Sequence, residues 1–299
     1  MSMTTISGYL VPEKFLPDLK KELRLIQGVH ENLVIATGPA QKSVWAQCIA
    51  SNAQIITFQS IGEAAKILRA HGRNWAHHPT SNHRRAQLIQ DQLPKMKDNK
   101  LEFLGPLPTP CGIWSLLDKN TLFFSAETNL PIPLGEIKFS EEKETPPSRA
   151  YLKLWELFTV YGVLPVRGSQ VIDFGSCPGG WTWVLQQVGC QVLSIDKAPL
   201  DPRVAALPGV KFLKADAFSL KPEDLGPVDW FFSDIICYPP KLFELVKNWK
   251  DKGLCSRFVC TIKFQGETDF KTMERFEKEL GAQVTHLFHN KHEVTAIIR

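Results

Sequence analysis

The alternation of apolar runs with glycine-rich turns after residue 170 limits the possible folds more than any other feature of the chain. Strands that alternate with helices at this spacing predict an α/β fold with a mostly parallel, doubly wound sheet. Ligands bind beyond the carboxyl ends of such strands, so the residues that follow each strand are the candidates for function. We predict strands over 171–174, 191–195, 210–213, 228–233 and 257–262, helices over 179–188, 242–249 and 270–280, and a closing antiparallel pair over 283–287 and 293–298.

The first of these strands ends in a glycine-rich turn. Glycines at positions 175, 179 and 180 allow a sharp turn and a close approach of the backbone to a ligand, at the start of the next helix. A turn of this kind can also simply connect a strand to a helix. The segment reads Asp173-Phe174-Gly175-Ser176-Cys177-Pro178-Gly179-Gly180-Trp181.

Carboxylates at the ends of the next strands favour a binding site. Asp196 follows the second strand, where an acidic side chain can accept hydrogen bonds from both hydroxyls of a ribose. Asp216 follows the third strand, where it can bind an adenine amino group beside Phe218, and Asp234 follows the fourth. Each alone would more often be a solvated loop residue. Acidic residues at four successive strand ends predict a pocket for a nucleoside.

The glycine turn also distinguishes between cofactors that contain a nucleoside. A dinucleotide fingerprint presents glycine amides to a pyrophosphate, whereas this turn has Pro178 and lacks the second glycine of that pattern. S-adenosylmethionine has no phosphates, so the turn need contact only its amino acid part. We therefore predict S-adenosylmethionine as the cofactor, bound by Gly175, Cys177, Pro178, Gly179, Gly180, Trp181, Asp196, Asp216 and Asp234.

The residues before position 145 follow an α+β pattern. The segment 129–148 contains four prolines and a charged run, which indicate a linker. We therefore expect two domains, a smaller α+β domain over 1–144 and an α/β domain over 145–299. In the first we predict strands over 7–11, 32–37 and 54–59, helices over 13–26, 61–70 and 82–93, and a hairpin of 113–117 with 121–125.

The most basic part of the chain lies in the first domain. The net charge is only +4, so bulk charge does not indicate a nucleic-acid-binding protein. A local basic face can nevertheless follow the phosphates of RNA. The window from 66 to 100 contains only two acidic residues, Asp91 and Asp98. Its basic residues are Lys66, Arg69, Arg73, Arg84, Arg85, Lys95, Lys97 and Lys100.

The composition argues against several other classes of protein. The seven cysteines are scattered and never spaced as C-x-x-C, so neither a disulfide framework nor a zinc site is predicted. His286, His289 and His292 have no companion ligands, and we expect no metal. Residues 1–10 lack the features of a signal peptide, and no apolar run is long enough to span a bilayer. We expect a cytoplasmic protein that does not bind membranes.

Five segments of the chain resemble one family. They are similar to the FtsJ-like ribose 2′-O-methyltransferases, and within these to the RlmM family, which methylates a cytidine ribose in large-subunit (23S) ribosomal RNA. Cys177 before Pro178 and the ending HEVT favour that subfamily. The resemblance covers residues 125–299 and implies a Rossmann-like methyltransferase domain. The segments are SRAYLKLWE, DFGSCPGGWTW, SDIICYPPK, TIKF and LFHNKHEVTAIIR.

The resemblance also implies four catalytic residues. The Lys-Asp-Lys-Glu tetrad of the family matches Lys153, Asp234, Lys263 and Glu293. Lys263 would accept or polarise the proton of the ribose hydroxyl; the Lys153 ammonium would lower the pKa of Lys263, and the two carboxylates would oppose that shift. A single lysine at a strand end is usually a surface charge. Ser148, which the resemblance places near the cofactor, also fits as the N-cap of the helix that carries Lys153.

The expected partner is RNA, either 23S ribosomal RNA or its precursor, bound by a monomer or weak dimer. The family carries a ferredoxin-like module and an RNA-binding THUMP module before the methyltransferase. Residues 1–144 are too few for both at full size, so we expect an abbreviated RNA-binding domain.

Two alternative functions remain open. Tyr238-Pro239-Pro240 is similar to the N/D-P-P-Y loop of base N-methyltransferases, although its prolines lie beyond the expected position. The other alternative is a non-catalytic RNA-binding factor for ribosome assembly, and the intact tetrad argues against it.

Overall fold

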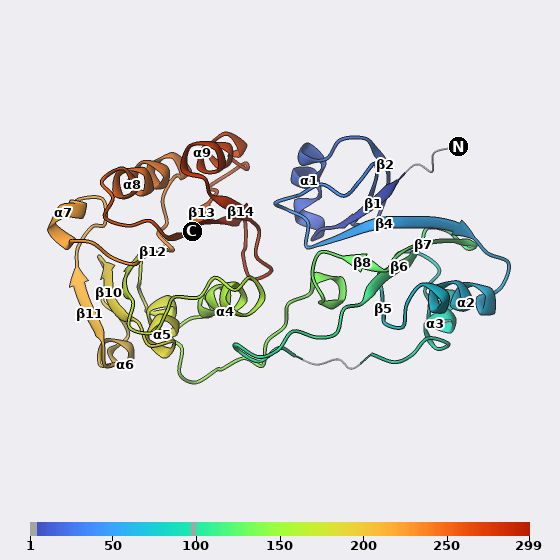
Figure 1. Cartoon of the computed structure of the whole chain (residues 1–299), viewed down its shortest axis with the longest axis horizontal. Helices are drawn as coiled ribbons and strands as arrows, with labels where there is room; N and C mark the ends of the chain where they lie inside the picture. Colours follow the sequence, from blue (N-terminus) through green and yellow to red (C-terminus); the bar gives the residue numbers. More distant parts are fainter. Residues whose placement is uncertain (1–4, 97–99) are drawn as a thin grey trace. The chain divides into compact units, whose positions relative to one another are not determined.

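The computed structural model describes residues 5–96 and 100–299, which form two compact units. The first unit extends to Lys138, and the second is Phe139–Arg299. Each unit contains its own sheet (Figure 1). None of the helices in the described ranges is long and apolar enough to cross a bilayer.

The sheet of the first unit is mixed. Its strands run in the order β2-β3-β1-β4-β7-β6-β5, with β8 paired to β4, and every pairing is antiparallel except that of β5 with β6. The strands are β1 (Ile6–Leu10), β2 (Ile26–His30), β3 (Leu33–Thr37), β4 (Cys48–Thr57), β5 (Trp75–His77), β6 (Gly112–Leu116), β7 (Thr121–Ser125) and β8 (Glu127–Thr128). The helices are α1 (Leu16–Glu22), α2 (Ile61–His71) and α3 (His83–Gln90), with short 3-10 turns η1 (Glu13–Phe15) and η2 (Pro133–Gly135).

The α+β pattern expected for this unit is confirmed, with one wrong element. The hairpin forms as predicted, because Ile113 pairs with Ser125 and Leu116 with Leu122. The helix predicted over 13–26 ends at Glu22, and residues 26–30 form β2 instead. Strand β2 pairs with β3, and this hydrogen bonding to a neighbouring strand outweighs the local helical pattern.

Helices α2 and α3 cover one part of this sheet. The Ser60 hydroxyl accepts a hydrogen bond from Glu63 N at 3.2 Å, and the Glu63 carboxylate accepts one from Gln59 N at 2.7 Å. This reciprocal pair satisfies the amide of Glu63 in the first turn of α2 and that of Gln59 just before the helix, and so fixes the start of α2. The core beneath the two helices contains Ala64, Ala65, Leu68, Ala86 and Ile89 packed with Trp75, Trp114 and Phe124.

The second unit contains the predicted doubly wound sheet. Its strand order is β11-β10-β9-β12-β13-β15-β14; the first five are parallel, and β15 runs antiparallel to β13 and β14. After β9 the chain adds β10 and β11 on one side of that strand, and then crosses to place β12 on its other side. Ligands bind at such a point, where the strand order reverses. The strands are β9 (Gln170–Phe174), β10 (Gln191–Asp196), β11 (Val210–Lys214), β12 (Trp230–Ser233), β13 (Phe258–Lys263), β14 (Gln283–Thr285) and β15 (Glu293–Ile298).

Helices cover both faces of this sheet. Figure 1 shows α8 and α9 on one face, and α4 and α5 on the other. Two short helices, each opened by a proline, were not expected from the sequence. The helices are α4 (Tyr151–Val160), α5 (Gly180–Gln187), α6 (Pro202–Ala205), α7 (Pro222–Leu225), α8 (Pro239–Asp251) and α9 (Phe270–Leu280).

Candidate active site

Two lysines and two carboxylates meet at the carboxyl edge of the parallel strands. Lys153 Nζ lies 3.0 Å from Asp234 Oδ1 and 2.6 Å from Glu293 Oε1. Lys263 Nζ lies 3.1 Å from the same Asp234 oxygen and donates a hydrogen bond to the Asp234 carbonyl at 2.6 Å. The structure thus brings together the four residues that the resemblance implies are catalytic.

The fold explains why these distant residues meet. Lys263 is the last residue of β13 and Glu293 the first of β15, and the two are direct partners in the antiparallel register. Asp234 follows β12, which is the parallel neighbour of β13. Lys153 reaches the same point from the first turn of α4.

The two lysines have different surroundings. Burial would lower the pKa of Lys153, but the Asp234 and Glu293 carboxylates raise it above its ordinary value. Burial would raise the pKa of Asp234, but the two ammonium groups hold it below its ordinary value. The Lys153 side chain is 9% exposed, whereas that of Lys263 is 18% exposed and lines a cleft. Lys153 is therefore an enclosed permanent charge, and only Lys263 can meet a substrate directly.

The cleft beside Lys263 has a volume of about 330 Å³. It lies beyond the ends of β9, β10 and β11, where the sequence predicts nucleoside binding. Its lining includes Gly175, Cys177, Asp196, Asp216, Phe218, Asp234, Ile235, Ile236 and Lys263.

The two carboxylates predicted to bind the nucleoside are held by neighbouring loops. Asp196 accepts hydrogen bonds from Cys177 N at 3.0 Å and Ala198 N at 2.9 Å. Asp216 pairs with Lys197 Nζ at 2.8 Å and accepts a bond from Phe218 N at 3.1 Å. Both contacts lower the pKa of Asp216. A carboxylate has about four acceptor positions, so each keeps capacity for a ligand.

The glycine turn disfavours side chains at all three of its glycines. Gly179 has φ +118°, and a Cβ there would stand 2.9 Å from Val204 Cγ1. Gly175 has φ +75°, and a Cβ there would stand 2.8 Å from the Cα of Ile235. A Cβ on Gly180 would stand 2.5 Å from Ser148 Oγ. The turn therefore needs glycine at 175 and 179 for both conformation and space, and at 180 for space.

Three buried polar atoms around this turn have no hydrogen-bond partner among the described residues: Ser148 Oγ, Ser176 Oγ and Asp173 Oδ1. Buried polar groups in native proteins are nearly always paired, so a group of unpaired ones indicates a bound polar ligand or water. The sequence assigns Asp173 no role beyond its place at the strand end. Asp173 is fully buried, its other oxygen accepts a bond from Thr182 Oγ1 at 2.6 Å, and burial raises its pKa to about 7.

One predicted detail needs correction, and the predicted cofactor contacts of several residues stay predictions. Ser148 does not cap α4, because the N-cap is Ala150 and no side chain makes a capping bond. The reason is that residues 149–150 form a turn before the helix begins. Trp181 does not line the cleft; it is 3% exposed, and its indole donates to the Ala150 carbonyl at 3.0 Å. Pro178, Gly179 and Gly180 are likewise absent from the cleft lining.

Glu156 is a buried residue that the sequence analysis missed. It is fully buried in α4, one turn after Lys153, and accepts hydrogen bonds from Phe288 N, His289 N and His289 Nδ1 at 2.9, 3.2 and 2.7 Å. These bonds attach α4 to the turn that leads into Glu293. Its position within SRAYLKLWE, on the same face of the helix as Lys153, was the available signal.

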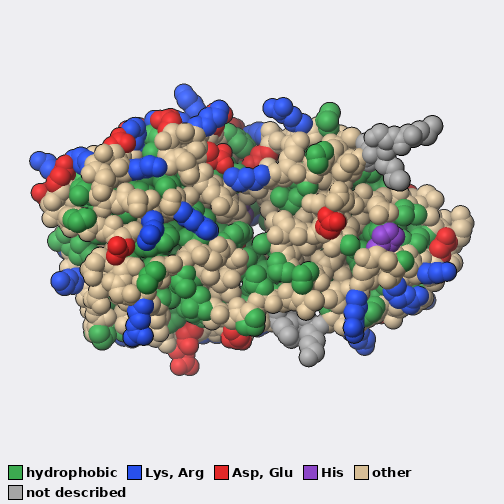
Figure 2. All heavy atoms as spheres, viewed as in Figure 1, with side chains coloured by type: hydrophobic (Ala, Val, Ile, Leu, Met, Phe, Trp, Pro, Cys, Tyr) green, Lys and Arg blue, Asp and Glu red, His purple; other side chains and the backbone are tan. Residues whose placement is uncertain are grey.

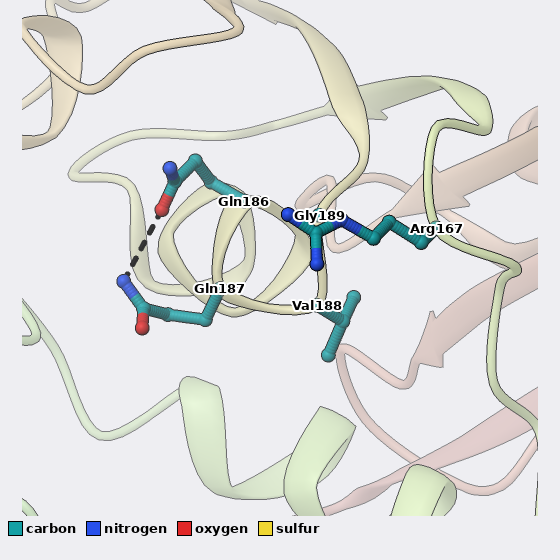
Figure 3. Close-up of a pocket in the computed structure, with 5 residues that line it drawn as sticks. All are labelled: Arg167, Gln186, Gln187, Val188 and Gly189. Carbon is teal, nitrogen blue, oxygen red and sulfur yellow. Dashed lines mark hydrogen bonds between the residues drawn. The ribbon is translucent and has the colours of Figure 1, made fainter.

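A second hollow of about 300 Å³ lies away from these residues, at the end of α5 (Figure 3). Arg167, Gln186, Gln187, Val188 and Gly189 line it, and Gln187 donates to the side chain of Gln186 at 3.2 Å. Arg167 precedes β9, so this hollow is at the amino end of that strand. It contains no carboxylate and no lysine, and lacks the groups needed for the predicted chemistry.

The remaining motifs have structural contacts. His286 contacts the Lys291 carbonyl at 3.0 Å, His289 contacts Glu156, and His292 contacts Thr268 at 3.1 Å. Across residues 5–96 and 100–299, no cluster of three His, Cys, Asp or Glu side chains could hold a metal ion. Tyr238 is the N-cap of α8 and Pro239 its first residue, which explains the proline pair without a role in catalysis.

Comparison with known proteins gives a family match within the second unit and relatives whose similarity extends over a longer part of the chain. Residues 146–287 match the family model described as FtsJ-like methyltransferase. A protein named Ribosomal RNA large subunit methyltransferase M from Laribacter hongkongensis is 32% identical over 187 residues, covering 56% of this chain and 52% of that protein. The protein of the same name from Azoarcus sp. is 32% identical over 184 residues, covering 56% and 50%. The one from Marinobacter nauticus is 28% identical over 248 residues, covering 76% and 65%. This chain spans about half the length of the first two relatives.

Proposed function

Because this chain carries an FtsJ-like methyltransferase domain over residues 146–287, we propose that it transfers a methyl group from S-adenosylmethionine to a ribose 2′-hydroxyl of RNA. The observation that carries the proposal is the arrangement of Lys153, Asp234, Lys263 and Glu293 beside a cleft at the carboxyl edge of the sheet. The proposed substrate is large-subunit ribosomal RNA, after the name shared by the relatives, and the resemblance of the sequence motifs implies a cytidine as the methylated nucleotide.

The residues around the glycine turn fit the cofactor. Asp196 and Asp216 would accept hydrogen bonds from its ribose and adenine groups. Ser148, Ser176 and Asp173 offer unpaired polar atoms for its amino acid part. When bound, S-adenosylmethionine supplies an electrophilic methyl group on a sulfonium.

The four clustered side chains would prepare the ribose hydroxyl for attack. Lys263 reaches the cleft and would hold the hydroxyl oxygen in line and take or polarise its proton. Asp234 fixes the position of Lys263 through its carboxylate and its carbonyl. Lys153 is locked between two carboxylates, and it shares Asp234 with Lys263, so the two lysines are held in one network of ion pairs.

Methyl transfer to ribosomal RNA is the direct test. The protein is incubated with labelled S-adenosylmethionine and an unmodified transcript of large-subunit ribosomal RNA, and the RNA is digested to nucleosides. We expect ribose-methylated cytidine. Asp234→Asn is the matched control, because it keeps the shape and removes the charge that holds both lysines; it should form little product. A methylated base would support the base-methyltransferase alternative, and no product would support the non-catalytic one.

Cofactor binding is tested separately by calorimetry. Asp196→Ala removes the contacts to Cys177 N and Ala198 N, and we expect it to abolish binding of S-adenosylmethionine. Asp196→Asn is the control for loop structure, because it keeps one acceptor oxygen and loses the charge. Undiminished affinity in the alanine variant would show that the pocket is misassigned.

A further inference from the structure

Two apolar side chains are displayed to solvent in the segment that follows Asp234, and the first of them, Ile236, lines the cleft with Lys263. Ile236 is 78% exposed and Tyr238 is 66% exposed. Both lie in the segment between β12 and α8. Ile236 is the most exposed large apolar side chain in the part of the chain that the structure describes. Neighbouring exposed apolar side chains of this kind mark interaction sites more often than scattered single ones do.

The backbone that carries these side chains is held on both sides. Asp234 N donates to the Phe174 carbonyl at 3.1 Å, and Ile235 packs against Gly175 so closely that a Cβ on the glycine would be 2.8 Å away. After Tyr238, its carbonyl accepts bonds from Lys241 N at 3.0 Å and Leu242 N at 3.3 Å. Ile236 and Tyr238 are therefore presented by a fixed segment.

The same segment forms part of the cleft, and two lysines, Lys241 and Lys263, lie on or next to the cleft lining. Ile236 and Lys263 both line the cleft. Lys241, within the first turn of α8, lies 3.8 Å from the centre of the Phe218 ring, another lining residue. Figure 2 shows Lys and Arg side chains intermixed with hydrophobic ones on the face between α8 and α5. An apolar surface near positive charges is complementary to a nucleic acid with unpaired bases. The flat faces of such bases stack on apolar side chains, and the phosphates are negatively charged.

We propose that Ile236 and Tyr238 form a platform for the unpaired base of the nucleotide whose ribose reaches Lys263. The base would stack on the Tyr238 ring and pack against the Ile236 side chain, while the ribose enters the cleft and the adjoining phosphate faces Lys241. This inference rests on the proposed function, since it assigns the base next to the methylated ribose. Stacking on a tyrosine is tolerant of base identity, so the platform selects an unpaired nucleotide over a paired one.

Paired substitutions at Tyr238 test the platform. Tyr238→Ala should lower kcat/KM for the ribosomal RNA transcript by about 5- to 150-fold, the range for loss of one base–aromatic stack, and should weaken binding of a fluorescent oligocytidylate. Tyr238→Phe keeps the ring and should behave like the unchanged protein. Ile236→Ala should lower kcat/KM less than Tyr238→Ala does. Calorimetric affinity for S-adenosylmethionine should remain unchanged in the two Tyr238 variants, because Tyr238 does not line the cleft. The melting temperature should remain unchanged in all three variants, because these exposed side chains are outside the core.

Val166→Ala is the matched control, because Val166 is 73% exposed in the same unit but precedes β9 at its amino end. Wild-type kcat/KM in Tyr238→Ala, or an equal loss in Tyr238→Phe, would overturn the platform. If the unchanged protein transfers no methyl group, the proposed function fails. The platform is then judged by oligocytidylate binding alone, and unchanged affinity in Tyr238→Ala would overturn it too.

Discussion

At the scale of single residues, the site depends on one shared carboxylate. Asp234 Oδ1 contacts the ammonium groups of Lys153 and Lys263 at 3.0 and 3.1 Å. Lys153 also pairs with Glu293, whereas Lys263 pairs with Asp234, so the two lysines are not equivalent. The pKa of the enclosed Lys153 is raised by its two carboxylate partners, whereas Lys263 is the lysine that lines the cleft.

Replacement of Lys263 tests this division of roles. Lys263→Ala should lower the single-turnover rate of methyl transfer by about 10² or more, the scale of general-base catalysis, while S-adenosylmethionine affinity holds. Lys263→Arg should not restore the rate, because an arginine keeps its charge but does not release its proton in a protein. Rates are measured at saturating RNA. Near-normal turnover in the arginine variant would contradict proton acceptance and leave Lys263 a positioning charge.

Asp173 gives a prediction about pH and stability. Burial raises its pKa from 3.8 to about 7, so the folded protein binds this proton more tightly than the unfolded chain does. The contribution of Asp173 to the free energy of unfolding is therefore fully present below pH 4 and is lost as the pH rises through about 7.

Asp173→Asn removes this titration and keeps an acceptor for Thr182. The stability of the asparagine variant relative to the unchanged protein should rise between pH 5 and 8, by at most about 3 kcal/mol. Urea unfolding of the cofactor-free proteins at several pH values measures the difference. A difference that stays constant with pH would mean that Asp173 is ionised throughout.

At the scale of elements, the sequence predicts best those that depend on their own periodicity. The helix predicted over 270–280 is α9 (Phe270–Leu280), and the strand predicted over 293–298 is β15 (Glu293–Ile298). Strand β2 was missed because partner β3 determines its conformation. For the same reason, the pairing of Lys263 with Glu293 could not be read from spacing, since the order of β13 and β15 is a property of the sheet.

The contact between α5 and the turn before α4 gives an element-scale prediction. Gly180→Ala would place a Cβ 2.5 Å from Ser148 Oγ and should destabilise the protein by about 1–3 kcal/mol, as overpacking does. In a Ser148→Ala background the hydroxyl is absent, and the next atoms are 3.4 Å away. The second substitution should then be neutral or stabilising, because alanine suits a helix better than glycine. A double-mutant cycle by urea unfolding measures the coupling, and additive effects would contradict the contact.

At the scale of the whole molecule, the two units were not equally predictable. The second unit carries motifs whose residues recur at strand ends. Its fold and many of its candidate site residues could therefore be predicted from the sequence. The first has no such motif, and its assignment as an abbreviated RNA-binding domain stays a prediction. Its basic window is divided by the fold: Arg84 is exposed, whereas Arg85 is half-buried, bonds Asn120 at 3.2 Å and lies over the Phe58 ring. Lys97 and Asp98 of this window lie outside the described residues.

Charge reversal on this face tests whether the first unit contributes to RNA binding. Lys66 on α2 and Arg84 on α3 are exposed, so Lys66→Glu with Arg84→Glu should spare the core, whereas reversal of Arg85 would also remove its contacts with Asn120 and Phe58. If these side chains contact phosphates, the double variant should bind the ribosomal RNA transcript more weakly. The slope of log affinity against log salt should become shallower by about 1 to 2, because fewer counterions are released. Lys20→Glu with Arg24→Glu, at two exposed positions in and just after α1, makes the same charge change elsewhere in the unit and should alter the slope less. Calorimetric affinity for S-adenosylmethionine should be unchanged in every variant, and a salt slope equal to that of the unchanged protein would mean that this face is merely solvated.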